Sequence, residues 1–284
     1  MKFVGIDLAW SERNPSGVAV IEAGGTLSHA AGDLRTNQDI CDYAGLKEGE
    51  DAVIAIDAPL IVRNKDKQRP VERELTEIFG PYDAAPYPAN LSNPAFQEGG
   101  RIQQFIRLLA DLGLEQQPRI RKQESQRAFL EVFPSPAQVI LFPGMTHNDH
   151  GHCRPPRYKF KRGRSWAETQ CEWEICRARL LSLRAKEPAL RFSADVKTAL
   201  SVDTENCRGV QYKALDDLLD GIFCAYLAYY FWYWGEDRCW VVGDVRSGYV
   251  TLPCCGLPNC ELNESRNVRN RTQIQDQQAR GTVR

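Results

Sequence analysis

The sequence predicts an α/β protein with a mixed sheet flanked by helices, and three observations support this prediction. First, the apolar residues 3–6 are followed by Asp7, which is the pattern of a buried strand that reaches the edge of a sheet. Second, the same pattern recurs over residues 53–57. Third, turn signals that contain glycine divide residues 2–34 into three strands before the first helix begins.

The first part of the chain is expected to form a meander followed by a helical crossover. Strands are expected over residues 2–10, 17–22 and 26–34, joined by short turns. Thr36 is a suitable N-cap for a helix that runs to about residue 46. The strand over residues 53–57 follows this helix, so we expect it to lie parallel to an earlier strand.

The remaining elements follow with longer connections. Helices are expected over residues 71–79, 100–112, 134–141, 166–186 and 211–234, and strands over 129–133, 240–245 and 248–252. We therefore expect a single domain over residues 1–262, built on a mixed five-stranded sheet, with helical and loop insertions around 60–127 and 144–205. Residues 263–284 are polar and lack a hydrophobic pattern, which is typical of a disordered tail.

Composition and charge limit the possible classes of protein. The chain has 36 Lys and Arg and 37 Asp and Glu, so any nucleic acid must be bound through a local basic patch. The longest apolar run, residues 222–234, is shorter than the roughly 20 residues of a membrane span, so no membrane partner is expected. No secretion signal is visible after Met1, and we expect a cytoplasmic protein whose ten cysteines are reduced.

Acidic side chains end the two matching strands. If these strands are parallel neighbours, Asp7 and Asp57 lie side by side at the carboxyl edge of the sheet, where ligands bind in α/β folds. Two close carboxylates repel each other, and a bound divalent cation relieves that repulsion.

A third acidic segment lies near the start of the long C-terminal helix. Asp217 and Asp220 are three residues apart, and Asp216 and Asp220 are four apart, so each pair shares a helix face. Complementation of the helix dipole together with exposure to solvent is one explanation for these acids. Together with Asp7 and Asp57 they predict a metal site.

Five groups of residues carry a resemblance to a known family. They are Gly5-Ile6-Asp7-Leu8-Ala9-Trp10 with Pro15-Ser16-Gly17, Ile56-Asp57-Ala58-Pro59-Leu60, Arg69-Pro70-Val71-Glu72, Glu131-Val132-Phe133-Pro134, and Leu215-Asp216-Asp217-Leu218-Leu219-Asp220-Gly221. Over residues 2–252 the chain resembles the family catalogued as domain of unknown function 429, described as predicted nucleases of the RNase H-like superfamily. The resemblance implies an RNase H-like β-β-β-α-β-α-β core in which the first and fourth strands are parallel neighbours.

The same resemblance implies metal-dependent hydrolysis of phosphodiester bonds, in which two Mg²⁺ or Mn²⁺ ions activate a water and stabilise the leaving oxygen. Asp7 would bridge the ions and Asp57 would hold one of them. Asp217 and Asp220, whose spacing resembles that of Holliday-junction resolvases, would hold the other. Glu131 is a further catalytic candidate. Because Phe133-Pro134-Ser135 stands where the family often has His-Pro-Glu, the alternative stays open that Glu131 is a strand residue that faces solvent or pairs with an arginine.

A basic stretch with interleaved aromatic residues follows a histidine-rich segment. Cations neutralise phosphates and aromatic rings stack on bases, so we predict that four residues of this stretch bind nucleic acid, either RNA or DNA. These residues are Arg157, Lys159, Lys161 and Arg162. A solvated charged loop is the alternative. The preceding residues 147–153 either bind a metal such as Zn²⁺ or form a surface loop.

Two other functions stay open beside a nuclease. One is a non-catalytic RNase H-like scaffold that binds nucleic acid or a protein. The other is a phosphotransferase of the actin-like ATPase class, which requires a second glycine-rich phosphate loop that the sequence lacks. The sequence motifs of P-loop NTPases, dinucleotide-dependent dehydrogenases, serine hydrolases with a nucleophile elbow and zinc proteases are also absent.

Overall fold

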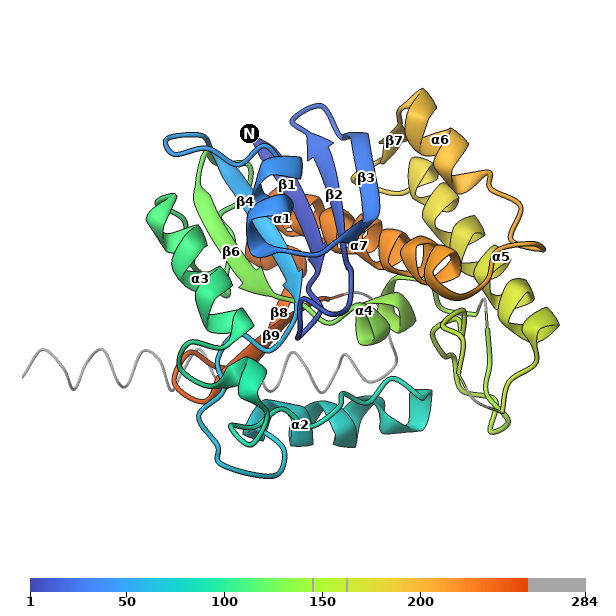
Figure 1. The fold of residues 1–284 in the computed structure, drawn as a ribbon, viewed down its shortest axis with the longest axis horizontal. Coiled ribbons are helices and arrows are strands. Elements are labelled where there is room, and N and C mark those ends of the chain that lie inside the picture. The colour runs from blue at the N-terminus through green and yellow to red at the C-terminus, as the bar shows by residue number, and fades with distance from the viewer. Residues whose placement is uncertain (145, 162, 255–284) are drawn as a thin grey trace, which may run out of the picture.

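The computed structural model describes residues 1–144, 146–161 and 163–254, and its largest element is a seven-stranded sheet with the order β5-β6-β4-β1-β2-β3-β7 (Figure 1). The strands are β1 Lys2–Asp7, β2 Ser16–Glu22, β3 Thr26–Leu34, β4 Ala52–Asp57, β5 Glu115–Gln116, β6 Arg127–Glu131 and β7 Arg191–Phe192. The predicted mixed α/β class is confirmed. The polar tail predicted over residues 263–284 lies outside the described residues.

The central strands have the predicted directions. β1, β2 and β3 form an antiparallel meander. β4 is parallel to β1, and β6 is parallel to β4. Within the β1–β4 pair, Asp7 lies directly opposite Asp57. The prediction that these two strands are parallel neighbours is therefore confirmed.

Two short strands at the sheet edges were not predicted. β5 pairs with β6, and β7 pairs with β3, both in the parallel direction. Each is two residues long, too short for any alternation of polar and apolar residues to indicate a strand. The main sheet in the described part of the chain consequently has seven strands instead of five.

Seven α-helices are described, and several begin where sequence signals predict. Their bounds are α1 Asn37–Tyr43, α2 Pro70–Phe79, α3 Arg101–Asp111, α4 Pro134–Leu141, α5 Trp166–Ser182, α6 Ala194–Leu200 and α7 Gly209–Trp234. Thr36 and Asp39 form a capping box at α1. Pro70 and Pro134 occupy the first turns of α2 and α4, where a missing N–H costs no hydrogen bond. Among these described helices, none has both the length and the apolar character needed to cross a membrane.

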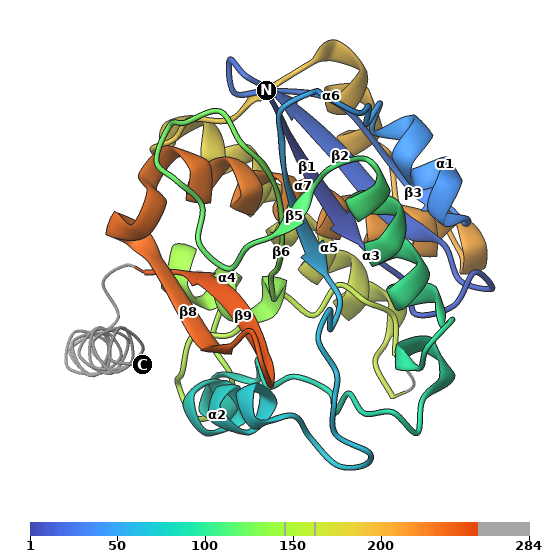
Figure 2. The ribbon, with the colours of Figure 1, turned by 90° about the vertical axis from the view of Figure 1, so that its left-hand side faces the viewer.

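A separate hairpin lies next to the carboxyl end of the sheet. It consists of β8 Cys239–Asp244 and β9 Gly248–Pro253, which pair in the antiparallel direction. A bridge between Val132 and Thr251 joins β9 to the segment that follows β6. Figure 2 shows the hairpin between α2 and the rest of the fold, with α2 beyond the carboxyl end of β4.

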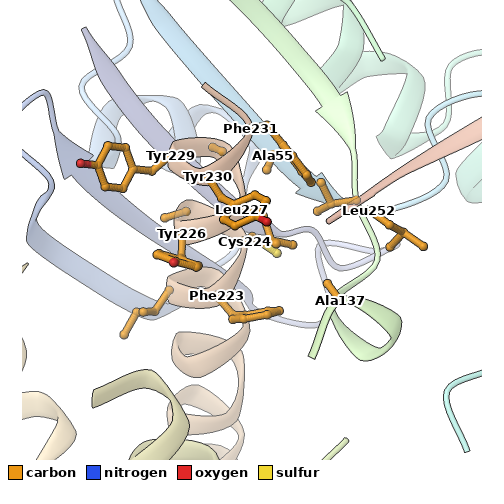
Figure 3. Close-up of a cluster of buried hydrophobic side chains, with 14 of the residues drawn as sticks. Ala55, Ala137, Phe223, Cys224, Tyr226, Leu227, Tyr229, Tyr230, Phe231 and Leu252 are labelled. Atoms are coloured by element: carbon orange, nitrogen blue, oxygen red, sulfur yellow. The ribbon is translucent and has the colours of Figure 1, made fainter. Parts of the chain in front are cut away.

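Helices cover both faces of the main sheet. Alternate residues of β1 enter different cores: Phe3 packs on the side of α7, whereas Val4 packs on the side of α1 and α3. Figure 1 shows α7 crossing behind the strands and α1 in front of them. The apolar second half of α7 packs against Ala55 of β4, Ala137 of α4 and Leu252 of β9 (Figure 3).

Glycine residues allow α7 to lie directly on the sheet backbone. A Cβ atom at Gly5, Gly17 or Gly32 would lie only 1.8, 1.8 or 1.7 Å from a backbone atom of α7. These three glycines belong to three neighbouring strands. On the helix side, a Cβ at Gly221 would lie 2.8 Å from the carbonyl carbon of Gly17. Any side chain at these positions would push α7 away from the strands.

Gly5→Ala should therefore lower the free energy of unfolding by about 3 kcal/mol, because the added methyl group meets helix backbone that cannot rotate away. Gly80→Ala is the control, since Gly80 has helical backbone angles and a Cβ atom added there would meet no other atom within 4 Å. It should leave stability unchanged or raise it by up to about 1 kcal/mol. Urea unfolding measures both variants, and equal midpoints would contradict the close contact.

Candidate functional site

Four predicted metal ligands meet at one end of the main sheet. Asp7 and Asp57 are the last residues of β1 and β4. Asp217 and Asp220 come from the first half of α7. All four line one pocket with a volume of about 640 Å³. The structure thus brings together the acidic residues that the sequence selects as ligands.

The contact between α7 and β2 buries the helix acids. A Cβ at Gly17 would lie 1.8 Å from the carbonyl oxygen of Asp217, so this turn of α7 rests on the strand. Asp216, Asp217 and Asp220 are only 3%, 1% and 2% exposed, whereas the side chain of Asp7 is 16% exposed. Carboxylates buried this deeply require partners.

Two lysines supply positive charge to these acids. Lys159 Nζ lies 2.6 Å from Asp220 Oδ2 and 4.0 Å from Asp7 Oδ2. Lys213 Nζ forms an ion pair with Asp217 Oδ1 and lies 3.6 Å from Asp216 Oδ2. The lysine side chains are 43% and 46% exposed, and both line the pocket. Each ammonium group therefore reaches the buried acids from the solvent side.

A buried tyrosine holds Asp220 from the other side. The Tyr158 hydroxyl donates a hydrogen bond to Asp220 Oδ1. Tyr212 of α7 donates to the Tyr158 carbonyl oxygen at 2.7 Å. These two bonds fasten the segment before α5 to α7 and fix the orientation of the Asp220 carboxylate.

Burial and crowding make several of these carboxylates hard to ionise. Burial raises the pKa of Asp7 and raises that of Asp57 well above its usual value, with the Asp7 charge adding to the effect at Asp57. Burial also raises the pKa of Asp216 to about 7 and that of Asp217 to about 8. Ionising an acid whose pKa rises on folding costs stability, so for Asp217 this cost grows as pH rises from 3.8 to about 8.

The donor set suits a hard divalent cation. Carboxylate oxygens are preferred ligands of Mg²⁺ and Mn²⁺. Asp216 Oδ1 and Asp217 Oδ2 are buried without a hydrogen-bond partner among the described residues. Within the same residues no group of three potential ligands is already arranged as a metal site, and Lys159 bridges Asp7 and Asp220 instead. The donor atoms therefore suit such an ion in their chemistry, and the lysine ammonium groups neutralise them in this arrangement.

Glu131, expected as a further catalytic candidate, belongs to a buried ion-pair network. Its Oε1 accepts from Arg69 Nη2 at 2.6 Å, and its Oε2 accepts from the Leu60 N–H at 2.8 Å and from Arg69 Nη1 at 3.1 Å. Glu72 accepts from Arg69 Nε at 2.8 Å. Both oxygens of Glu131 are thus engaged, which supports the pairing with an arginine that the sequence left open.

The predicted nucleic-acid-binding residues fall into two groups. Three of them line the pocket, namely Arg157, Lys159 and Lys161, whereas Arg162 lies outside the described residues. The Arg157 guanidinium pairs with Asp83 at 2.7 Å, and Lys161 Nζ donates to the Tyr87 hydroxyl at 3.0 Å. The described cations of this stretch therefore make specific contacts at the pocket.

The histidine-rich segment forms a turn. The Asn148 side chain accepts from the backbone N–H groups of His150 and His152, and the His152 ring packs against Tyr82 at 5.5 Å. No metal-binding group of three ligands occurs there in the described part of the chain. Of the two interpretations left open, this arrangement supports the surface loop.

Two residues that contact the acids were not predicted as site residues. Lys213 precedes Asp217 by four residues on the same helix, and this spacing could have identified the pair. Tyr158 is 62 residues from Asp220 in the sequence, and no local pattern indicates that its hydroxyl reaches α7.

Arg69→Met should lower the free energy of unfolding by about 3–5 kcal/mol, because it leaves Glu72 and Glu131 buried without a cation. Arg177→Met is the control: Arg177 pairs with Glu174 at 2.5 Å on the surface, and its loss should cost less than about 1 kcal/mol. Guanidinium titration followed by circular dichroism compares the two. A small loss in both variants would argue against a structural role for the network.

Comparisons with known proteins place the chain in a family. No curated protein and no solved structure matches it. A family model described as "Protein of unknown function (DUF429)" matches residues 5–246. This range includes both acidic strand ends, the buried arginine network and the acids of α7. The chain therefore belongs to the DUF429 family.

Proposed function

We propose that this protein is an RNase H-like nuclease that uses a divalent metal to hydrolyse phosphodiester bonds in nucleic acid. The observation that carries the proposal is that Asp7, Asp57, Asp217 and Asp220 line the same pocket as a set of basic side chains. The acids suit metal ions, and the basic side chains suit the phosphates of the substrate.

The arrangement of the central elements supports the RNase H-like part of the proposal. β1, β2 and β3 form the meander, α1 leads to β4 beside β1, and β6 follows on the far side of β4. These five strands correspond to the β-β-β-α-β-α-β core that the family resemblance implies. The two-residue strands β5 and β7 extend this core at its edges.

Asp7, Asp57, Asp217 and Asp220 would hold Mg²⁺ or Mn²⁺. When bound, such ions supply an activated water and stabilise the leaving oxygen. Residues of the chain hold the ligands in position: Tyr158 orients Asp220. Glu131 binds the Leu60 N–H and so fixes the backbone that follows Asp57.

Lys159 and Lys213 have two roles in this proposal. Each neutralises buried acids in the absence of a cation, through the ion pairs described above. Because both side chains are long and nearly half exposed, their ammonium groups can turn towards substrate phosphates when a cation takes over that task.

Two rival functions fit the site less well. A non-catalytic scaffold has no use for a buried oxygen of a proposed ligand that lacks a hydrogen-bond partner in the part of the chain that the structure describes, such as Asp217 Oδ2, since it lowers stability. An actin-like ATPase requires a second glycine-rich phosphate loop, which the sequence lacks. In the proposed nuclease, the buried acids would serve as metal ligands.

Single substitutions should separate the ligands from their neighbours. Asp7→Asn and Asp217→Asn should lower Mg²⁺- or Mn²⁺-dependent cleavage by more than about 100-fold, the upper end for groups that merely orient a metal ligand. Asp220→Asn should lower it strongly. Asp216→Asn should leave most of it, because the side chains that line the described pocket do not include Asp216. Turnover of labelled RNA and DNA strands measures the effects.

The control for this series is Asp33→Asn, since Asp33 is an exposed residue of β3. It should keep full activity. An inactive Asp216→Asn beside an active Asp217→Asn would show that the other helix acid is the ligand. Full activity of Asp7→Asn, or no cleavage by the wild type with either metal, would favour the scaffold.

Metal binding should also be visible without any substrate. Mg²⁺ or Mn²⁺ at about 100 times its Kd should stabilise the wild type by about 2.7 kcal/mol, or roughly 2–4 °C in Tm for each kcal/mol. Asp217→Asn should show little of this shift. In EDTA at about pH 8 the same variant should melt above the wild type, because burial and the nearby Asp7 disfavour the ionisation of Asp217 and asparagine carries no such cost. Equal metal-induced shifts in both proteins would contradict the assignment.

A further inference from the structure

Two large aromatic side chains are exposed on the described surface. Tyr87 is 72% exposed and Phe160 is 59% exposed, and the other large apolar residues with comparable exposure are valines. Most aromatic residues of this chain are buried in, or packed against, one of the two hydrophobic cores. The two exposed rings belong to neither core.

Tyr87 belongs to the acidic pocket, and Phe160 lies next to it in the chain segment that passes the pocket. Tyr87 lines the pocket directly. Phe160 stands between Lys159 and Lys161 in the chain, and both of these lysines line the same pocket. Lys161 Nζ donates to the Tyr87 hydroxyl at 3.0 Å, across 74 residues of sequence. This bond holds Tyr87 beside the segment that carries Phe160.

The faces of the Tyr87 ring are not covered by its lysine partner. Lys161 Nζ is 3.0 Å from the hydroxyl oxygen but 5.5 Å from the ring centroid. The ammonium group consequently lies beyond the hydroxyl end of the ring and not over a face. A flat group can stack on the ring while the ammonium stays beside it.

The Phe160 ring is held by a chain of contacts that ends at the acids. It packs against Trp166 at 5.8 Å, and Trp166 packs edge-on against Tyr212 at 4.6 Å. Tyr212 bonds to the carbonyl of Tyr158, whose hydroxyl bonds to Asp220. An aromatic ring that is exposed yet fixed in this way loses little conformational entropy when a ligand stacks on it.

We infer that Tyr87 and Phe160 form a base-stacking platform and that the site takes single-stranded nucleic acid in preference to duplex. The inference rests on the proposed function, because it names the substrate of the same pocket. Bases inside a duplex have both faces occupied by their neighbours, whereas an unpaired base can stack on a protein ring. Arg157, Lys161 and Arg164 line the pocket beside the rings and would neutralise the adjoining phosphates.

Binding in EDTA tests the inference without cleavage. The probes are fluorescein-labelled RNA and DNA strands about 12 nucleotides long, within the range of roughly 4–16 nucleotides for single-strand sites. An abasic strand of equal length and a blunt duplex accompany them. Each stacked base should contribute about 5- to 150-fold in affinity, so the wild type should bind the strand with bases more tightly than the abasic strand and the duplex.

Tyr87→Ala and Phe160→Ala should each lose that factor for the strand with bases and keep the affinity for the abasic strand. Tyr87→Phe and Phe160→Tyr retain a ring and should bind as the wild type does. Val245→Ala, at an exposed position of the hairpin turn, is the surface control. Equal affinity for strands with and without bases, a preference for duplex, or alanine variants that bind like the wild type would overturn the inference.

Cleavage assays with Mg²⁺ or Mn²⁺ separate this inference from the proposed function. If the wild type prefers strands with bases but cleaves nothing, the platform stands and the nuclease fails. If it cleaves duplex and single strands equally, and the alanine variants match it, the nuclease stands and the platform fails.

Discussion

The close approach of α7 to the sheet brings the acids of the helix to the acids at the strand ends. A helix that packs on a sheet through large side chains stands well above the strands, and its polar residues then remain near the solvent. Here Gly5, Gly17 and Gly32 remove those side chains from three adjacent strands. The helix backbone therefore lies at the level of the strand ends, and Asp217 and Asp220 share a pocket with Asp7 and Asp57.

The two halves of α7 have opposite effects on the stability of the protein. The second half is apolar and anchors the helix in the larger core, where Leu227 and Phe231 are fully buried. The first half carries acids into an environment that disfavours their charge. The apolar packing of the second half offsets the unfavourable free energy of burying the acids of the first half. A cation that relieved this unfavourable free energy on binding would bind more tightly by the same amount.

Much of the fold could be predicted because its signals are local. Buried runs that end in aspartate predicted β1 and β4, and capping residues and prolines predicted the starts of α1, α2 and α4. The acids that line the pocket follow from the same strand ends and from helix spacing. What escaped prediction depends on contacts between distant segments. The Arg69–Glu131 pair spans 62 residues, and the bond from Tyr158 to Asp220 spans 62 as well. Neither contact is accompanied by a periodic pattern in the sequence from which it could be predicted.

The short edge strands have a consequence for the behaviour of the protein at high concentration. The interior strands β1, β2 and β4 are almost wholly apolar, and such segments associate readily when their backbone is unpaired. In the native sheet they are flanked on both sides, and the outermost places belong to β5 and β7 with only two residues each. β7 pairs with only Thr26 and Leu27 of the nine-residue β3, so most of β3 belongs to this edge as well, and the apolar strands lie inside it. The fold thus protects the aggregation-prone strands β1, β2 and β4 from intermolecular β-pairing for as long as the edge strands remain in place.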